Sequence, residues 1–244
     1  MTNQPADMSR REFREWRDKH SSHKTPEVPT SPPAATPAPR PTDSTDDHPL
    51  TILTVCTGNI CRSPMAEVLL RARLESLGIR VHSAGTHALV GHEMTGPAQE
   101  LAVELGAKPE DAAAHTARYL VEPMLQDADL ILTMTREHRT HAVQLVPRTL
   151  RRTFTVREFA RLASTLSTQA ARATADAEGD DPRARLSAAI LAVGEQRGMS
   201  AGGQEDDDVV DPYRRSREVY EESASQLNPA LDEVERILRA ALVQ

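Results

Sequence analysis

The chain has 244 residues, a formal net charge of −7 at pH 7 and an aromatic content of only 3%. This length suits one good-sized domain with tails, or two small domains. The acidic balance argues against nucleic acid or an anionic membrane as the main partner. No apolar stretch reaches transmembrane length, and two cysteines in so long a chain do not make a disulfide framework. We therefore expect a protein of the reducing cytosol, with a cytoplasmic location.

Residues 1–49 are expected to form a disordered, proline-rich N-terminal tail. Within it, residues 8–20 could form a short charged helix, although only Phe13 and Trp16 are available to anchor it. Seven of the 17 residues in the stretch 25–41 are proline, and such a composition cannot pack a core. Its PxxP spacings fit a ligand of a proline-binding module, but a spacer is the commoner outcome of this composition.

A folded domain is expected over residues 50–244, with strands and helices in alternation. The strands are near-continuously apolar, which is typical of a parallel sheet covered on both faces. The fold class is therefore α/β, a doubly wound four-stranded parallel sheet with helices on both faces and a phosphate-binding loop after the first strand. The pattern predicts strands at 50–55, 79–84, 128–135 and 152–156, and helices at 63–77, 97–105, 136–146, 157–166 and 214–242.

Two segments should depart from this alternation. Residues 167–205 are rich in Ala, Arg, Asp and Gly, which predicts a mobile insertion with a short helix near 183–193. Pro229 lies within the last predicted helix and should break it or open a fresh first turn. The helix after the first strand should be capped by Ser63.

Cys56 ends the first predicted strand and is followed by the stretch TGNICRSP. In a doubly wound sheet, ligands bind beyond the carboxyl ends of the strands, where the strand order reverses. The loop 57–62 can curl so that its backbone N–H groups converge on one anion, and the N-terminus of the next helix adds positive potential. Gly58 and Asn59 tolerate the left-handed backbone angles that such a loop needs.

Arg62 and Ser63 complete this pattern. The planar guanidinium of Arg62 can grip two oxygens of a phosphoryl group. The positive field of the loop favours the thiolate of Cys56, which is the nucleophilic form, and the Ser63 hydroxyl could donate to it. The combination predicts phosphoryl transfer to Cys56 and then hydrolysis of the thiophosphate, with Arg62 and the loop amides holding the equatorial oxygens of the transition state.

Two plainer interpretations of the cysteine pair are weaker. Cys56 and Cys61 could be buried structural thiols beside a surface arginine, but the strand before them and the helix after them make a coincidence improbable. A zinc pair is weaker still, because the chain has only these two cysteines and no nearby histidine pair has ligand spacing. We expect no metal and no cofactor.

These residues carry a resemblance to a known family, the bacterial low-molecular-weight protein tyrosine phosphatases. The family signature of Val-Cys, five residues and Arg-Ser is matched by Val55, Cys56, TGNIC, Arg62 and Ser63. The resemblance runs from about residue 50 to the C-terminus, apart from the insertion. It implies that Cys56 is the nucleophile and Arg62 the phosphate clamp. The phosphate-binding loop that it implies consists of Thr57, Gly58, Asn59, Ile60, Cys61, Arg62 and Ser63.

The resemblance also implies residues that support this loop. Ser83 and His115 match positions that join Asn59 and Ser63 in a network bracing the loop. Cys61 matches a cysteine that can form a reversible disulfide with the nucleophile. We expect Cys61 to be a redox guard that captures an oxidised Cys56 rather than a participant in catalysis.

The family's general acid lies in an Asp-Pro-aromatic loop, which here is Asp211, Pro212 and Tyr213. On composition alone, Asp211 could be one more member of the acidic run 205–208. Proline biases the residue before it toward extended angles, so Asp211 should lie on a defined loop. A tyrosyl leaving group has a pKa of about 10, so protonation helps its departure. Tyr213 and Ile60 would form walls for an aromatic substrate.

The chain departs from the family in a few places. Arg214 stands where the family often has a second aromatic residue, and the segment 87–98 has no aromatic to form the opposite wall of a phenyl-ring slot. Thr135 stands where the family often has Asp. The insertion directly precedes the acid loop and could cover or reshape the entrance. These departures concern the choice of substrate and leave the chemistry intact.

The expected function is hydrolysis of phosphotyrosine in a phosphorylated protein, and three alternatives stay open. One branch of the family hydrolyses phosphoarginine and carries a smaller Thr where this chain has Ile60, whose bulk favours an aryl phosphate. Another branch reduces arsenate, for which only Cys61 could serve as a second protein thiol. The third alternative is a non-catalytic phosphoresidue-binding protein, against which the catalytic acid Asp211 argues.

Overall fold

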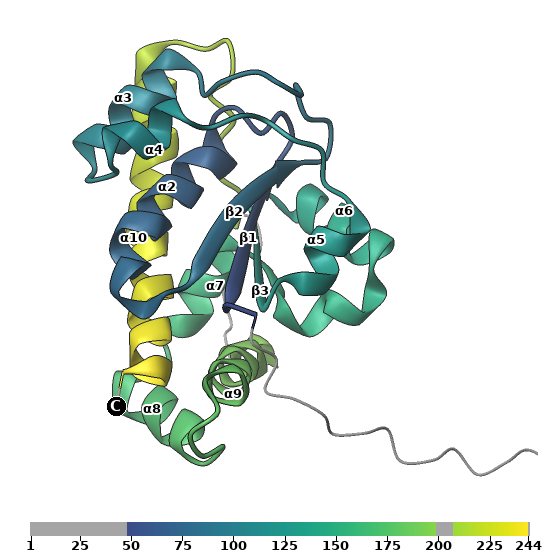
Figure 1. Cartoon of the computed structure of the whole chain (residues 1–244), viewed down its shortest axis with the longest axis vertical. Helices are drawn as coiled ribbons and strands as arrows, with labels where there is room; N and C mark the ends of the chain where they lie inside the picture. The colour runs from purple at the N-terminus through teal and green to yellow at the C-terminus, as the bar shows by residue number, and fades with distance from the viewer. Residues whose placement is uncertain (1–47, 199–206, 244) are drawn as a thin grey trace, which may run out of the picture. The chain divides into compact units, whose positions relative to one another are not determined.

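The computed structural model describes residues 48–198 and 207–243, and Figure 1 shows their arrangement. The expected helix at 8–20 and the proline-rich stretch 25–41 lie outside the described residues, as does the end of the insertion from residue 199. None of the described helices is long and apolar enough to cross a membrane.

The centre of the fold is a parallel sheet of four strands in the order β2-β1-β3-β4. The chain leaves the central strand β1 for β2 on one side and then returns to β3 on the other side, so the strand order reverses beside β1. This topology confirms the predicted fold class. The strands are β1 (Thr51–Cys56), β2 (Arg80–Gly85), β3 (Leu130–Thr133) and β4 (Thr153–Thr155).

Alternate strand residues pack into two separate hydrophobic clusters, one on each face of the sheet. Ile52 and Leu132 belong to the larger cluster, whereas Leu53 and Ile131 belong to the smaller one. The larger cluster is covered by α2 (Arg62–Leu74), α7 (Val156–Ala163) and α10 (Arg217–Leu242), and the smaller by α5 (Glu122–Asp127) and α6 (Arg136–Leu145). Figure 1 shows these helices on opposite sides of the strands.

Several short elements were not expected from the sequence. The helices α4 (Pro109–Ala113) and α5 are five and six residues long, and both have proline in their first turn. Segments this short carry too few residues for a 3.6-residue period to be recognised. The remaining elements are α3 (Gly96–Glu104) and the 3₁₀ helices η1 (Glu75–Leu77) and η2 (Pro147–Arg152).

The described part of the predicted insertion is regular and packed, which differs from the mobile segment expected over 167–205. It forms α8 (Thr168–Asp176), α9 (Pro182–Glu195) and η3 (Gln196–Gly198). Side chains cap both α-helices, since Ser167 accepts from the Ala170 N–H and Asp181 accepts from the Arg183 and Ala184 N–H groups. The buried residues Ala171, Ala175, Leu186, Ala189, Ile190 and Val193 join the larger hydrophobic cluster. The helix α9 corresponds to the short helix expected near 183–193, whereas α8 buries only Ala171 and Ala175 and therefore has a weak apolar pattern in the sequence.

These helices lie at the amino ends of the strands, away from Cys56. Arg183 on α9 forms an ion pair with Asp129, which precedes β3, and its Nη2 donates to the carbonyl of His48, 2.8 Å away, which precedes β1. Figure 1 shows α8 and α9 at the end from which β1 starts. Residues 167–198 therefore do not cover the entrance at the carboxyl ends of the strands, contrary to what their position in the sequence suggested.

The helix α10 continues through Pro229 instead of breaking there. Proline removes one backbone hydrogen bond and crowds the preceding turn. The helix nevertheless buries Leu227, Leu231 and Val234 on either side of this residue, and that apolar stripe packs against α2, α7 and α8. The burial of the stripe outweighs the cost of the proline.

The packing of α9 can be tested with two neighbouring residues. Ile190 is 2% exposed and Leu191 is 37% exposed. We expect Ile190→Ala to lower the free energy of unfolding by about 2–4 kcal/mol, because it leaves a cavity in the core. The control Leu191→Ala should lower it by less than about 1 kcal/mol. Urea titration followed by circular dichroism measures both, and equal small effects would contradict the packing described for α9.

Candidate active site

Cys56 ends the central strand β1 at the point where the strand order reverses, and α2 begins at Arg62. Its side chain is buried, and its Sγ accepts from the Asn59 N–H at 3.3 Å. The Ser63 hydroxyl oxygen lies 3.0 Å from the same Sγ. Ser63 therefore does not cap α2 as expected, because the helix begins one residue earlier and the hydroxyl faces the sulfur. Both contacts suit a thiolate.

The carbonyl groups of residues 56–60 all accept hydrogen bonds from chain segments outside the loop. Because the C=O and the following N–H of a trans peptide point in opposite directions, each outward carbonyl turns the next N–H toward the inside of the loop. Successive inward N–H groups form a concave site that attracts an anion. The partners are Thr86 N for Cys56 O (2.9 Å), His87 N for Thr57 O (2.9 Å), Leu89 N for Gly58 O (3.0 Å), His115 Nε2 for Asn59 O (2.8 Å) and Thr95 N for Ile60 O (2.9 Å).

Asn59 has the left-handed backbone conformation expected of it, with φ 56°. Its side chain holds this strained turn, because Nδ2 donates to Ser63 Oγ at 3.0 Å and to Ser83 Oγ at 2.7 Å. Its Oδ1 accepts from the Arg118 N–H at 2.9 Å. The structure thus brings together Asn59, Ser63, Ser83 and His115, the four residues that the resemblance assigned to bracing the loop.

Glu67 joins this network and was not anticipated from the sequence. It is 1% exposed, accepts from Ser83 Oγ, pairs with Arg71 and lies with its Oε2 3.5 Å from His115 Nδ1. Burial alone would raise the pKa of Glu67, but the contacts with His115 and Ser83 and the charge of Arg71 outweigh it, and the net shift lowers the pKa. The sequence did hold one sign of this contact. Glu67 lies four residues after Ser63, so the two residues share one face of the predicted helix.

His138 on α6 also contacts the loop, although the sequence gave it no role. Its Nε2 lies 2.8 Å from Thr57 Oγ1, and its Nδ1 lies 2.9 Å from Thr135 Oγ1. Burial, with the charge of Arg62 as the next cause, lowers the pKa of His138 to about 4. The neutral ring at pH 7 carries one N–H, so it donates to one threonine and accepts from the other. Thr135 therefore orients a histidine beside the loop that follows Cys56.

Arg62 connects the loop to the predicted acid. Its guanidinium is buried, with Nη1 3.1 Å from the Val209 carbonyl oxygen and Nη2 2.7 Å from Asp211 Oδ2. The Nε atom of Arg62 is buried and has no hydrogen-bond partner among the described residues. A donor of this kind can serve an oxyanion held in the loop.

The segment before Asp211 is fixed by contacts with four other elements. Asp207 pairs with Arg161 of α7 at 2.8 Å, and Asp208 pairs with Arg136 of α6 at 3.3 Å. Asp207 and Asp208 thus anchor the segment, whereas Asp211 faces Arg62. The backbone contacts are Val209 N to Met134 O (2.8 Å), Val210 N to Gln226 Oε1 (2.9 Å) and Arg157 Nη1 to Asp208 O (2.9 Å).

Of the two expected substrate walls, Tyr213 is 38% exposed and Ile60 is 5% exposed. Ile60 lies in the larger hydrophobic cluster, so only Tyr213 presents a substantial surface. The Tyr213 N–H donates to Asp211 Oδ1 at 3.1 Å, which keeps the ring beside the acid. The Arg214 guanidinium lies 5.1 Å from the centre of the Tyr213 ring, a cation–π contact.

Cys61 is a free, buried thiol, as is Cys56. Its Sγ lies 3.3 Å from Thr95 Oγ1 and 3.7 Å from the Tyr220 hydroxyl. Burial raises the pKa of Cys61, so the thiol form is favoured over the thiolate. Its redox role stays an implication of the resemblance.

Comparisons with known proteins show which family the chain is similar to. A model of the family described as low molecular weight phosphotyrosine protein phosphatase matches residues 51–172. The low molecular weight protein-tyrosine-phosphatase Etp of Escherichia coli K12 is 45% identical over 96 residues, which are 39% of this chain and 62% of that protein. The match thus spans less than two thirds of Etp. The Ptp of Acinetobacter johnsonii is 41% identical over 103 residues, 42% of this chain and 69% of that protein.

Arginine phosphatases are among the similar proteins as well. The protein-arginine-phosphatase of Bacillus subtilis is 38% identical over 110 residues, which are 44% of this chain and 71% of that protein. The solved YwlE arginine phosphatase of Geobacillus stearothermophilus superposes with a TM-score of 0.53 and 28% identity, covering 77% of this chain and 91% of that one. The solved low molecular weight protein tyrosine phosphatase of T. tengcongensis superposes with a TM-score of 0.52 and 29% identity, covering 76% of this chain and 97% of that one.

The outward anchoring of the loop can be tested at Gly85. A Cβ added there would lie 2.5 Å from the Thr57 carbonyl oxygen, and the Gly85 backbone is itself bonded to Arg118 and Leu120. We expect Gly85→Ala to displace the Thr57 carbonyl and to weaken binding of inorganic phosphate at least about ten-fold, equivalent to about 1.4 kcal/mol. Isothermal titration calorimetry measures this affinity.

Gly96→Ala is the matched control, because a Cβ at Gly96 meets no atom within 4 Å. It should leave the phosphate affinity unchanged. If both alanine variants bound phosphate as tightly as the original chain, the outward carbonyls would not be what shapes the anion site.

Proposed function

Because the chain belongs to the low-molecular-weight phosphotyrosine protein phosphatase family, we propose that it hydrolyses phosphate monoesters through a phosphocysteine formed on Cys56. The observation that carries the proposal is the position of Cys56 Sγ. It lies within a loop whose carbonyls face outward, with the Arg62–Asp211 pair beside it. A protein that only bound a phosphorylated residue would need neither a nucleophile nor an acid here.

In the first step, the Cys56 thiolate attacks phosphorus and the bond to the leaving oxygen breaks. The loop N–H groups and Arg62 hold the three equatorial oxygens, with the unpartnered Nε as an additional donor. Asp211 gives its proton to the departing oxygen. A bound phosphoryl dianion competes with the Asp211 carboxylate for the guanidinium of Arg62.

In the second step, water attacks the phosphocysteine and the sulfur leaves as the thiolate. Asp211, now ionised, takes a proton from the attacking water. The Asn59 N–H and the Ser63 hydroxyl stabilise the returning thiolate, since they lie 3.3 and 3.0 Å from Sγ. The inorganic phosphate then dissociates and the cycle closes without any cofactor.

Among substrates, we favour phosphotyrosine in a partner protein. The exposed Tyr213 ring is tied to Asp211 through its own N–H, so an aryl leaving group stacked on it would reach the acid. Phosphoarginine is the second candidate, supported by the similarity to the protein-arginine-phosphatase of Bacillus subtilis. Arsenate reduction has less support, because the buried Cys61 favours its thiol form.

The cellular setting follows from the same chemistry. A catalytic cycle through the free thiol of Cys56 requires a reducing compartment, which supports a cytoplasmic location. The partner in this setting is a phosphorylated protein.

The mechanism can be tested with Cys56 and Asp211. We expect Cys56→Ser to abolish hydrolysis of phosphotyrosine peptide while still binding phosphate, because the anion site persists. Asp211→Asn should lower kcat by about 10²–10⁴-fold, the range typical of a general acid. Asp208→Asn is the control, since Asp208 anchors the segment through Arg136. A loss from Asp208→Asn as large as that from Asp211→Asn would make the assignment of the acid wrong.

The substrate class is decided by one comparison. Phosphotyrosine peptide, phosphoarginine peptide, and arsenate with a thiol reductant are each offered to the purified chain and to Tyr213→Ala. We expect the highest kcat/KM for phosphotyrosine, with a loss of about ten-fold in Tyr213→Ala that is absent for phosphoarginine. A preference for phosphoarginine that Tyr213→Ala leaves unchanged would replace the first candidate by the second.

A further inference from the structure

His138 lies between two threonine hydroxyl groups, one of which belongs to the phosphate-binding loop. The histidine is 5% exposed. Its Nδ1 lies 2.9 Å from Thr135 Oγ1, and its Nε2 lies 2.8 Å from Thr57 Oγ1. Both distances suit hydrogen bonds. The proposed mechanism uses neither the imidazole nor the hydroxyl of Thr57, although Thr57 directly follows the nucleophile.

The direction of these hydrogen bonds follows from Thr135. Its Oγ1 caps the N-terminus of α6 and accepts from the His138 backbone N–H at 3.3 Å. Among the described residues, Nδ1 of His138 is the one acceptor bonded to the Thr135 hydroxyl. A hydroxyl has a single proton, and leaving it without an acceptor at this half-buried position costs free energy. The Thr135 hydroxyl therefore donates to Nδ1.

The proton of the imidazole then lies on Nε2. Burial lowers the pKa of His138 to about 4, so the ring is neutral at pH 7 and has one N–H. Because Nδ1 accepts from Thr135, Nε2 donates to Thr57 Oγ1. The Thr57 hydroxyl thus keeps its own proton, for which no described residue supplies an acceptor. Thr57 is exposed, so a ligand can supply one.

We propose that the Thr57 hydroxyl donates to a phosphoryl oxygen of the bound substrate, and that His138 is the residue that positions it. This role rests on the proposed phosphatase function. The Cys56 carbonyl accepts from the Thr86 N–H, so the Thr57 N–H points into the loop. The backbone and the hydroxyl of Thr57 thus serve the same anion, and hydrogen bonds to a charged acceptor are the stronger ones.

The tautomer of His138 can be observed in the full chain without a ligand. Imidazole ¹⁵N resonances distinguish a protonated ring nitrogen from an unprotonated one. We expect His138 to carry its proton on Nε2 at pH 7. A proton on Nδ1 would overturn the proposal, because Thr57 would then donate to the histidine and have no proton left for the substrate.

Binding of inorganic phosphate, measured by isothermal titration calorimetry, tests the hydroxyl itself. Thr57→Val removes the hydroxyl and keeps the shape of the side chain, and it should weaken binding about ten-fold. Thr57→Ser keeps the hydroxyl and should stay within about two-fold of the original affinity. Thr174→Val on α8 is the matched control, since its hydroxyl donates to the Ala170 carbonyl within the helix. Full affinity in Thr57→Val, or an equal loss in Thr57→Ser, would overturn the proposal.

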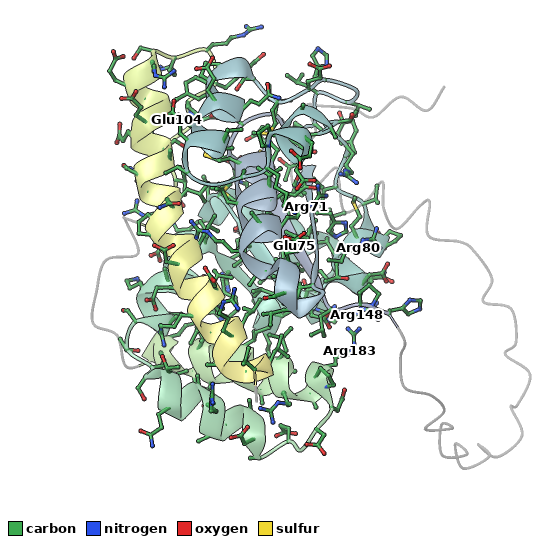
Figure 2. All side chains as sticks on the ribbon, turned by 60° about the vertical axis from the view of Figure 1, so that its left-hand side comes forward. Arg71, Glu75, Arg80, Glu104, Arg148 and Arg183 are labelled. Atoms are coloured by element: carbon green, nitrogen blue, oxygen red, sulfur yellow. The ribbon has the colours of Figure 1, made fainter. Side chains whose placement is uncertain are left out.

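An exposed arginine can bind phosphate independently of the loop, so one of them serves as a second control. Figure 2 shows Arg148 near the height of Arg183, whose partner Asp129 precedes β3. Arg148 is exposed and lies in η2, which precedes the amino end of β4. Arg148→Gln should leave the phosphate affinity unchanged. A loss as large as that in Thr57→Val would place the measured phosphate outside the loop and overturn the assignment.

Positioning by His138 predicts that two substitutions are not independent. His138→Leu removes the donor to Thr57 and should weaken phosphate binding about ten-fold, whereas His138→Gln keeps an N–H donor and should weaken it less. Adding Thr57→Val to His138→Leu should cost less than about a further two-fold. Losses that multiply to about 100-fold in the double variant would overturn the positioning role.

Hydrolysis of phosphotyrosine peptide separates this role from the proposed function. If the original chain hydrolyses the peptide and Thr57→Val binds phosphate as tightly as the original chain, only the role of Thr57 is wrong. If the original chain neither hydrolyses the peptide nor binds phosphate, both proposals are overturned.

Discussion

The site depends on the outward anchoring of one loop. Peptide groups have no freedom to point their N–H and C=O in the same direction, so fixing the carbonyls fixes the amides. Backbone groups of Thr86, His87, Leu89 and Thr95 fix four carbonyls, and His115 fixes a fifth. The orientation of the amides around Cys56 is therefore set by chain segments outside the loop. The left-handed turn at Asn59 is held by side-chain contacts as well. Asn59 donates to Ser63 and Ser83, and Ser83 donates to Glu67.

This dependence explains which parts of the site could be predicted from the sequence. The strand before Cys56, the Gly-Asn turn and the helix after Arg62 are local, and local preferences were sufficient to anticipate them. The pairing of Asp211 with Arg62 needed the family resemblance, because nothing local joins residues so far apart. The positions of Glu67 and His138 beside the loop were not predicted, because their contacts with it form only when separate elements pack together.

The fold shows the same division. Continuous apolar strands predicted the parallel sheet and its two covered faces correctly. Within 167–198 the predicted short helix near 183–193 corresponds to α9, whereas α8 was missed because its buried residues, Ala171 and Ala175, look similar in a helix and in a flexible stretch. At Pro229 the local sequence predicted a helix break. The helix α10 continues instead, because burial of its apolar stripe against other helices outweighs the local preference.

The attachment of the acid segment has a kinetic consequence. In many enzymes the catalytic acid is carried by a lid whose closing limits the rate. Here the segment from Asp207 to Val210 is bonded to Met134, which follows β3, and to α6, α7 and α10. Swinging it away would break several of these bonds at once, each contributing about 1 kcal/mol. The segment that carries Asp211, the proposed acid, therefore belongs to the rigid frame, and the proposed reaction needs no lid to bring this residue to Arg62.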